Sequence, residues 1–584
     1  QLIGETKFDT GDYKDLAPSC IPCFQPVSIP TALGEVDTSW NAAVAASKYV
    51  GEDFLQFTPP ECEVNQCEIS LMPGVVTGLK FMDSAECQSY LSKLSGANRK
   101  SHVPNNSHNA LKSPLAPFFI QAMVKELAGI SKLGVVSLEP LPKGKKAIPC
   151  RFVFDIKWDN SLNRLVKMKA RLVAQGFRQR EYNQMLGIGS YDPNDISSPV
   201  LKLTSLYAIT NLCASLPDMG LEAVDVGQAF LAAKLKTDGS EDIFLQLPTV
   251  CAVTNDGINI QPEVLKYSKS KTPKHVVKLI KALYGLKNSS KAWFRKISEY
   301  LIADGFQQSA EDMCLFTKIT TTGSIMLGIH VDDMLITGTR ALIATFKRDL
   351  GAYFINLGSK ITSEDASRPE GVQFLGSVIR KHEDGIVTMS QETRIEDVCK
   401  RFKIEIRSNG PTLPYQPGIV SEWQKSKSMP NTDEEREQHV KQIHDKINPE
   451  IRSYADVIRN FREYTGCLIW LCGAGCPQVL PIVYKLARYQ NSPGISHFIA
   501  VRRVLEYLYA NKHRPLTFGK QRIQELSGKQ IKQQALTIFT DTSHGDCPIT
   551  KRSTGGYVVF LFGSLLMMRS FRLSCTTTST TQSE

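Results

Sequence analysis

Residues 324–338 read SIMLGIHVDDMLITG, an apolar run that is interrupted by two adjacent acids, Asp332 and Asp333. A second apolar run, Leu221 to Leu231, contains a single acid, Asp225. Both runs predict buried strands, and a carboxylate in apolar surroundings has to be protonated, paired or bound to a cation. The adjacent pair therefore favours a metal site, whereas a tight turn with solvent-exposed acids is the common alternative for paired aspartates.

Upstream of these runs, the sequence predicts a β-hairpin that carries a row of cations. Apolar and polar residues alternate from Arg151 to Trp158, Asp159-Asn160 offers a turn, and Leu165 to Ala174 forms the returning strand. With a period of two, one face of the returning strand presents three cations. They are Lys167, Lys169 and Arg171. A solvated strand face is the simpler interpretation of this pattern alone.

The chain is too long for one domain, and its 584 residues are expected to form three or four compact units. Residues 1–103 carry scattered Pro, Gly, Ser and Asn and are expected to be a poorly ordered linker. An amphipathic helix from Pro117 opens the folded part, and residues 419–450 form a charged, partly helical connector. Later elements are helices from about Tyr454 and from Ser496 to Asn511, and strands at Leu536 to Asp541 and Gly555 to Leu566.

Composition places the chain among globular proteins of a reducing compartment. The 42% hydrophobic and 22% charged residues are typical of a soluble fold, and no segment reaches the roughly 18 uninterrupted apolar residues of a membrane span. Fifteen cysteines without dense spacing fit free thiols, and no secretory signal follows Gln1. A net charge of +11 attracts polyanions but identifies no partner by itself. We therefore expect an intracellular protein with no membrane partner, which begins at a fragment or processing boundary.

Several separated segments together resemble the reverse transcriptase of copia-type LTR retrotransposon (Pseudoviridae) Pol polyproteins. The resemblance extends from about residue 110 to 584 and rests on the number, order and spacing of the segments. A resemblance to ribonuclease H follows in residues 540–541, 552–557 and 579–584. The polymerase segments are PKGKK at 142–146, KARLVAQGF at 169–177, SPV at 198–200, DVGQAFL at 225–231, ALYGLK at 282–287, Trp293, HVDDMLI at 330–336 and FLG at 374–376.

The resemblance implies an α+β fold, a right-hand polymerase with fingers, palm and thumb and an antiparallel palm sheet. It places fingers and palm in residues 104–400, the thumb and connection in 401–530, and a truncated ribonuclease H-like α/β fold in 531–584. It also implies RNA-directed DNA synthesis, in which two divalent metal ions support the attack of a primer 3′-hydroxyl on a nucleotide. The alternatives are a catalytically inactive transposon relic that still binds nucleic acid, and a particle-assembly protein.

By the same resemblance, three acids form the catalytic centre. Asp225 and Asp332 are expected to be the direct ligands of two Mg²⁺ ions, with Mn²⁺ as an alternative ion. Asp333 is expected to lie beside them, to bind less directly and to shape the local charge. The intact set of three acids argues against the relic.

The resemblance also implies how nucleotide, template and primer are bound. Lys169 and Arg171 would neutralise the triphosphate, and Phe230 would exclude a ribonucleotide by its bulk, with ordinary core packing as the alternative. Asn288, Ser290 and Lys291 depart from the family's usual Gln, Pro and Arg, and His330 replaces the commoner Tyr. The residues expected at the template and primer are Tyr284, Gly285, Lys287, Asn288, Trp293, His330, Phe374 and Gly376.

Only two acids of the ribonuclease H resemblance are present, Asp541 and Glu584, so we expect no ribonuclease H activity from this chain alone. The partners implied for the polymerase are an RNA template, a DNA or tRNA primer and deoxynucleoside triphosphates, together with a Gag-type particle protein. The location implied is in cytoplasmic particles, with the nucleus as a second site.

Overall fold

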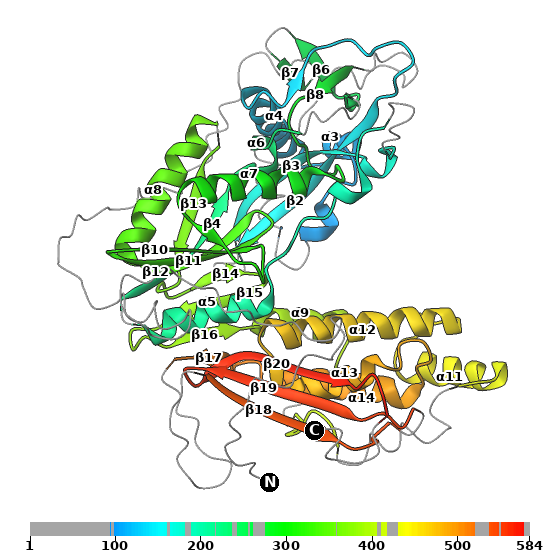
Figure 1. The fold of residues 1–584 in the computed structure, drawn as a ribbon. Coiled ribbons are helices and arrows are strands. Elements are labelled where there is room, and N and C mark those ends of the chain that lie inside the picture. Colours follow the sequence, from blue (N-terminus) through cyan, green and yellow to red (C-terminus); the bar gives the residue numbers. More distant parts are fainter. Residues whose placement is uncertain are drawn as a thin grey trace.

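The computed structural model describes Leu94 and residues 99–576 apart from internal gaps, of which the longest are 261–274, 417–429 and 520–535. Most of the expected linker, residues 1–93, and the acid Glu584 therefore lie outside the described residues. Figure 1 shows a five-stranded sheet at the top, a six-stranded sheet in the middle, and helices with a three-stranded sheet below. Within the described part of the chain, no helix is both long and apolar enough to cross a bilayer.

The upper unit, here called the fingers, is built on the predicted hairpin. The strands β2 (Ile148–Asp159) and β3 (Arg164–Ala174) pair antiparallel, and β3 forms one edge of the sheet β1-β8-β5-β2-β3. The predicted amphipathic helix is α4 (Ala116–Lys132), whose Phe119 packs edge-to-face on Phe154 of β2 at 5.4 Å. Hairpin and helix are thus confirmed. Further elements are α3 (Ser107–Lys112), β1 (Val136–Ser137), β5 (Phe244–Gln246), β6 (Cys251–Thr254), β7 (Gly257–Ile260) and β8 (Val276–Leu279).

The middle unit, here called the palm, is a six-stranded sheet in the order β13-β4-β12-β11-β10-β9. Helix α5 (Leu203–Ser215) covers one face, and α7 (Ser289–Ala303) and α8 (Arg340–Asn356) cover the other. Because both faces are covered, the strands read as nearly continuous apolar runs. The strands are β4 (Met219–Val226), β9 (Gln307–Gln308), β10 (Leu315–Thr320), β11 (Gly323–His330), β12 (Asp333–Thr339) and β13 (Ile361–Asp365).

Three apolar runs that predict single strands are interrupted by turns, so these predictions are wrong in detail. The run 324–338 is a hairpin of β11 and β12, and the run 221–231 ends as a strand at Val226 and continues into the short helix α6 (Ala229–Ala232). The run 555–566 is divided between β19 (Thr554–Leu561) and β20 (Ser564–Arg572). Each break contains a non-glycine residue with positive φ, and hydropathy carries no signal for such a backbone. These residues are Gln228, Val331 and Phe562.

Below the palm, a helical unit, here called the thumb, surrounds its own core. Its helix α9 (Glu392–Arg401) contributes Ile395, Val398 and Cys399 to that core, so the thumb begins before the expected boundary at residue 401. A small sheet, β14-β15-β16-β17, joins it to the palm. The remaining elements are α11 (Asp433–Lys446), α12 (Tyr454–Ala474), α13 (Leu480–Ala487), α14 (Ile495–Ala510), β14 (Val372–Phe374), β15 (Ser377–Lys381), β16 (Val387–Ser390) and β17 (Leu516–Phe518).

The C-terminal sheet, in which β18 (Leu536–Ser543) pairs with β19 and β19 with β20, is packed directly on the palm. Leu565 of β20 lies in the same buried cluster as the apolar side of α5. The Asn211 side-chain amide on α5 donates to the Leu565 carbonyl oxygen at 2.9 Å, and the Gly519 N–H donates to Ser564 Oγ at 2.8 Å. The described part of this segment therefore completes the underside of the palm. The α+β class predicted from the sequence is confirmed.

Replacing Leu565 by alanine should destabilise the palm by about 2–4 kcal/mol, because a buried leucine is lost and a cavity remains. The matched control is Leu536→Ala on the same sheet, since Leu536 is 46% exposed and Leu565 only 7%. Urea denaturation followed by circular dichroism measures both. Equal effects of the two substitutions would show that the C-terminal sheet does not stabilise the palm.

Candidate active site

The pairing of β4 with β12 brings two of the three predicted acids together. Asp225 on β4 lies directly opposite Asp333 on β12, and Asp333 is also the partner of His330 across the hairpin. Directly opposite residues of an antiparallel pair point to the same face with their Cβ atoms about 5 Å apart. Asp332 occupies the two-residue turn beside them. The three acids thus meet at one end of the palm sheet.

Asp225 and Asp333 are exposed, and Asp332 is half-buried. The interpretation of these acids as residues inside buried strands is therefore wrong for Asp225 and Asp333. The physical reason is position, because the acids stand at the sheet end that the covering helices leave open to solvent. The sequence offered two interpretations of the paired acids, a metal site and an acid-bearing hairpin turn. The structure has the hairpin turn at the same sheet end at which the metal site was expected.

Asp333 and Asp225 have raised pKa values, although both residues reach solvent. Partial loss of hydration beside the surrounding protein raises the pKa of Asp333 to about 6, and the charges of Asp332 and Asp225 add to this effect. The pKa of Asp225 is raised by burial and then by Asp332. Mutual repulsion of this kind is relieved by a cation between the carboxylates.

The turn that carries Asp332 is strained and clamped. Val331 has a φ of +60°, which is rare for a β-branched residue. Its carbonyl oxygen accepts a hydrogen bond of 2.7 Å from Trp293 Nε1 of α7. Trp293 is only 1% exposed, so the expectation that it contacts template or primer is wrong. Its ring belongs to the core, and its indole N–H fixes the acid-bearing turn instead.

His330 precedes this turn on β11 and is half-buried. Burial lowers its pKa, while the nearby Asp332 raises it by a smaller amount. A lowered pKa leaves the imidazole neutral at pH 7. Among the described residues, its buried Nδ1 has no hydrogen-bond partner. Contact with the primer stays a prediction for this residue.

The cations of the fingers hairpin lie within electrostatic reach of the acids. Lys169 and Arg171 are half-buried on β3, whereas Lys167 is exposed. Burial lowers the pKa of Lys169, and so do the neighbouring cations, while Asp225 raises it. The side chain of Lys157 lies opposite Lys167 on the hairpin. A row of like charges that faces a group of acids suits a polyanionic ligand bound between them.

Arg171 also belongs to a row of three contacting side chains, here called the wall. The other two are Tyr284 and Phe230. The Arg171 guanidinium lies 4.8 Å from the centre of the Tyr284 ring, a cation–π contact. The Phe230 ring meets Tyr284 edge-to-face at 5.3 Å. The three residues come from β3, the loop before α7, and α6. This wall contains two of the predicted nucleotide-binding residues and one predicted template residue.

The loop that carries Tyr284 is fixed to the end of β3. The Ala174 N–H donates to the Tyr284 carbonyl oxygen at 2.8 Å. Gly285 has a φ of +87°, and any Cβ there would collide with the Ala174 carbonyl oxygen and the Val173 side chain. Glycine is therefore required by this close approach. Gly285 is exposed, and its contact with the template stays a prediction.

Lys287 and Asn288 follow in the same loop. Lys287 Nζ donates to the Tyr191 hydroxyl at 2.7 Å and lies 3.9 Å from the centre of that ring. The Lys287 ammonium group is thus already bound to Tyr191 within the protein. Asn288 precedes α7, and within the described residues its buried Oδ1 lacks a hydrogen-bond partner. Their roles at the template stay predictions.

The two remaining residues that were expected to contact template or primer, Phe374 and Gly376, lie at the turn between β14 and β15. Phe374 is 1% exposed and packs in the palm core, so its expected contact with template or primer is wrong. Gly376 is exposed with a φ of +74°, and a Cβ there would lie 2.9 Å from the Trp470 ring. Beside it opens a cavity of about 480 Å³ whose lining includes Arg380 and Arg394. Gly376 thus borders a cavity, whereas Phe374 belongs to the core.

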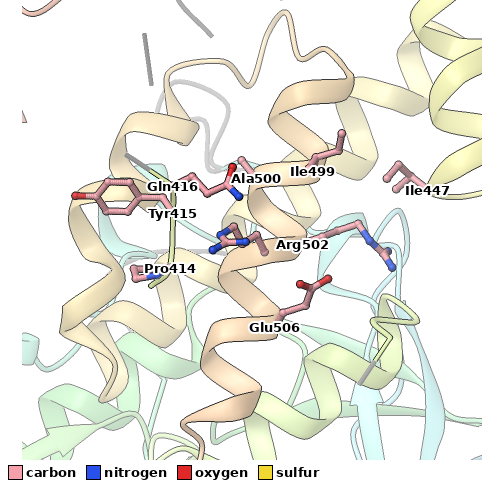
Figure 2. Close-up of a pocket in the computed structure, with 9 residues that line it drawn as sticks. Pro414, Tyr415, Gln416, Ile447, Ile499, Ala500, Arg502 and Glu506 are labelled. Carbon is pink, nitrogen blue, oxygen red and sulfur yellow. The ribbon is translucent and has the colours of Figure 1, made fainter. Parts of the chain in front are cut away.

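A second cavity lies in the thumb. Figure 2 shows Tyr415 and Ile447 on opposite sides of α14, which carries Ala500 and Arg502. The cavity measures about 220 Å³. Arg502 donates to the Phe402 carbonyl oxygen at 3.1 Å and the Tyr464 hydroxyl at 3.2 Å. This arginine therefore holds helices together, and the cavity lies apart from the sheet that carries the acids.

Of the two acids of the ribonuclease H resemblance, Asp541 belongs to the described residues. Asp541 is an exposed residue of β18, opposite Gly556. Glu584 lies outside the described residues. Their predicted role stays a prediction.

The donors present fit a divalent metal ion of the magnesium type. Across the described residues, no group of three or more His, Cys, Asp or Glu side chains is arranged to hold a metal ion. Mg²⁺ is typically held by one or two protein carboxylates together with substrate phosphates and water. Asp225 and Asp332 supply two hard oxygen donors within electrostatic reach of each other. Desolvation and then the charge of Asp332 raise the pKa of Asp225, and a bound cation would offset the second of these effects.

Comparison with known proteins agrees with this architecture. Residues 134–417 match the family described as reverse transcriptase (RNA-dependent DNA polymerase). The Pol polyprotein of transposon TNT 1-94 from Nicotiana tabacum is 29% identical over 485 residues, which cover 82% of this chain and 31% of the relative. The Pol polyprotein of transposon RE1 from Arabidopsis thaliana is 26% identical over 424 residues, covering 72% and 24%.

A shorter relative, the putative transposon Ty5-1 protein of Saccharomyces cerevisiae, is 25% identical over 308 residues, which cover 53% of this chain and 85% of the relative. A solved structure, the foamy viral protease-reverse transcriptase with double-stranded DNA, aligns with a TM-score of 0.34 and 12% identity over 76% of this chain and 54% of that one. Residues 134–417 therefore match a reverse transcriptase domain, and the plant relatives are Pol polyproteins of transposons. The chain spans 31% and 24% of the TNT 1-94 and RE1 polyproteins.

Replacing Asp333 by asparagine should raise the melting temperature at pH 7 in metal-free buffer, but not at about pH 4. The pKa of Asp333 is raised from 3.8 to about 6, so the folded protein binds this proton more tightly than the unfolded chain does. Stability therefore falls as pH rises between these two values and stays lowered above them. Melting curves of both proteins from about pH 4 to 8 measure the difference. A difference that is constant with pH would contradict the assignment.

Proposed function

We propose that this chain is an RNA-directed DNA polymerase, which transfers a nucleotidyl group to a primer 3′-hydroxyl. The observation that carries the proposal is the register that sets Asp225 opposite Asp333, with Asp332 in the adjoining turn. Asp225 is within electrostatic reach of Lys169 on the fingers hairpin. The match of residues 134–417 to reverse transcriptases supports the same conclusion.

In this mechanism, Asp225 and Asp332 would hold two Mg²⁺ ions, with Mn²⁺ as an alternative. Two bound ions stabilise the charge on the entering and leaving oxygens of an in-line displacement. Asp333 stands directly opposite Asp225 and supplies further negative charge at the same sheet end. The Trp293 hydrogen bond to Val331 keeps Asp332 in place during the reaction.

Lys169 and Arg171 would bind the triphosphate of the incoming deoxynucleotide. Their charges oppose those of the acids across the gap between fingers and palm, where the phosphates have to lie. A cation that contacts the leaving pyrophosphate stabilises the charge that develops there. Arg171 is oriented by its contact with Tyr284, so its direction is set before the nucleotide arrives.

The polymer partners follow from the same proposal. An RNA template and a DNA or tRNA primer would lie along the palm, beside the loop of Tyr284 and Gly285 and near Gly376. The solved structure of the foamy viral enzyme holds double-stranded DNA, and yeast relatives are named Gag-Pol polyproteins. These names support a nucleic-acid duplex and a Gag-type particle protein as partners. Location in cytoplasmic particles and the nucleus stays a prediction.

Asp332→Asn should reduce primer extension on an RNA template by about a thousandfold or more, since metal-assisted stabilisation is worth several kcal/mol. The measurement is extension by purified protein with Mg²⁺ and deoxynucleotides. The matched control is Asp304→Asn, because Asp304 pairs with Lys318 on another part of the palm. That variant should extend normally.

Binding of primer and template separates the proposal from its alternatives. If the unmutated protein binds the duplex but extends no primer with either Mg²⁺ or Mn²⁺, the chain is an inactive relic. If it instead assembles into particles by a route that does not require the three acids, it is an assembly protein. Extension that survives in Asp332→Asn would remove the proposed metal site.

Phe230→Val should increase ribonucleotide use, because the smaller side chain leaves room for a 2′-hydroxyl. We expect the ratio of kcat/KM for deoxynucleotide over ribonucleotide to fall about tenfold or more, as expected when a steric exclusion of about 1.4 kcal/mol or more is removed. Steady-state extension with matched dNTP and rNTP measures the ratio. An unchanged ratio would show that Phe230 serves core packing instead.

A further inference from the structure

Glu126 is a buried acid that faces the candidate nucleotide site from behind. It is 8% exposed and lies on the apolar side of α4, the side that also carries Phe119, Met123 and Ile130. A carboxyl group in such a position is costly unless it is used. Neither the motifs nor the family match assigns a role to this residue.

The first partner of Glu126 is the backbone of β3. Its Oε1 accepts a hydrogen bond of 3.1 Å from the Leu172 N–H. Leu172 follows Arg171 directly and pairs with Phe152 of β2 on its other side. Because β3 is the edge strand of the fingers sheet, no further strand is there to take up this N–H. Glu126 therefore fixes the strand at the position of the two candidate phosphate-binding cations.

The second partner is Gln228, which belongs to the palm. Its side chain lies beside Glu126 and lowers the pKa of that carboxyl group by a small amount. It also lies against α4 at Gly129, where any Cβ would collide with its amide nitrogen. Gln228 has a φ of +56° and directly precedes α6, the helix that carries Phe230. One carboxylate thus connects the fingers strand with the palm loop just after Asp225.

The charges around Glu126 agree with this position. Burial raises the pKa of Glu126, whereas the Leu172 N–H, Arg171 and Lys169 lower it. Glu126 in turn raises the pKa of Tyr284, whose ring lies between Arg171 and Phe230. The acid is therefore within electrostatic reach of Arg171 and Tyr284, two of the three residues of the wall.

We propose that Glu126 is a positioning residue for the incoming nucleotide, which holds Lys169 and Arg171 of the fingers in register with Phe230 of the palm. It acts through the Leu172 N–H and the Gln228 side chain and does not contact the nucleotide. The proposal rests on the polymerase function above. It predicts an effect on nucleotide affinity that a merely structural acid would not have.

Glu126→Ala should raise the KM for deoxynucleotide about tenfold, the size expected from loss of a charge-assisted hydrogen bond, with kcat changed less than about threefold. Glu126→Gln keeps an oxygen acceptor for the Leu172 N–H and should restore part of the affinity. The affinity for primer and template should stay unchanged. Steady-state extension over a range of nucleotide concentrations gives KM and kcat separately.

The matched control is Asp312→Asn. Asp312 is also buried, at 4% exposure, and accepts hydrogen bonds from the Lys202 and Cys314 N–H groups, both at 2.9 Å. It should lower the melting temperature without changing the KM for nucleotide. If Glu126→Ala behaves in the same way, with a loss of stability and an unchanged KM, the positioning role is overturned.

Hydrogen exchange tests the connection without any catalysis. In Glu126→Ala, backbone amides should exchange faster both in β3 around Leu172 and in the segment from Gly227 to Phe230. Faster exchange in β3 alone would overturn the link to the palm. If the unmutated protein extends no primer, the polymerase proposal fails by itself, and the exchange pattern still decides whether Glu126 joins the two units.

Discussion

The register between β4 and β12 is the constraint on which the rest of the site depends. It sets Asp225 opposite Asp333, and a slip of one residue would turn Asp225 to the other face of the sheet. Like charges in directly opposite positions destabilise a sheet. The register is held nonetheless, because α5 covers one face of the sheet and α7 and α8 cover the other with large apolar cores. The core thus supplies the stability with which the palm holds three repelling acids together.

The nucleotide wall shows how a site is made from segments that are remote in sequence. Arg171, Phe230 and Tyr284 come from three elements, and their side chains contact one another through the Tyr284 ring. The close approach of Gly285 to Ala174 joins the loop to β3, and Gln228 lies against Gly129 of α4. Fingers and palm are therefore joined at the place where an incoming nucleotide would lie, and their relative position bears on its binding.

The C-terminal sheet has a structural use that does not depend on nuclease chemistry. Leu565 is buried against α5, and the Asn211 amide donates to its carbonyl oxygen. The palm therefore has a fourth covering element, which comes from the end of the chain. This packing role does not depend on whether Asp541 takes part in any reaction.

Some features could be read from the sequence because their signals are local. The alternation in β2 and β3, the apolar stripe of α4 and the three acids in their apolar runs are patterns of hydropathy and charge with a short period. The turns at Val331 and Gln228 could not be read, because a positive φ at a non-glycine residue leaves no hydropathy signal. For the same reason, single strands were expected where hairpins and a short helix occur.

The degree of burial distinguishes residues that contact solvent from residues that support them, whereas their positions in the motifs do not. Trp293 and Phe374 stand in segments that resemble contacts to nucleic acid, yet both are 1% exposed. Glu126 gave a weaker signal, an acid at helical spacing among apolar residues. By itself, then, the sequence determined the fingers hairpin, the helix α4 and the kind of chemistry, since these follow from local pattern and residue type. Only the tertiary structure decided which side chains face the ligand and which support them, because that depends on packing between segments distant along the chain.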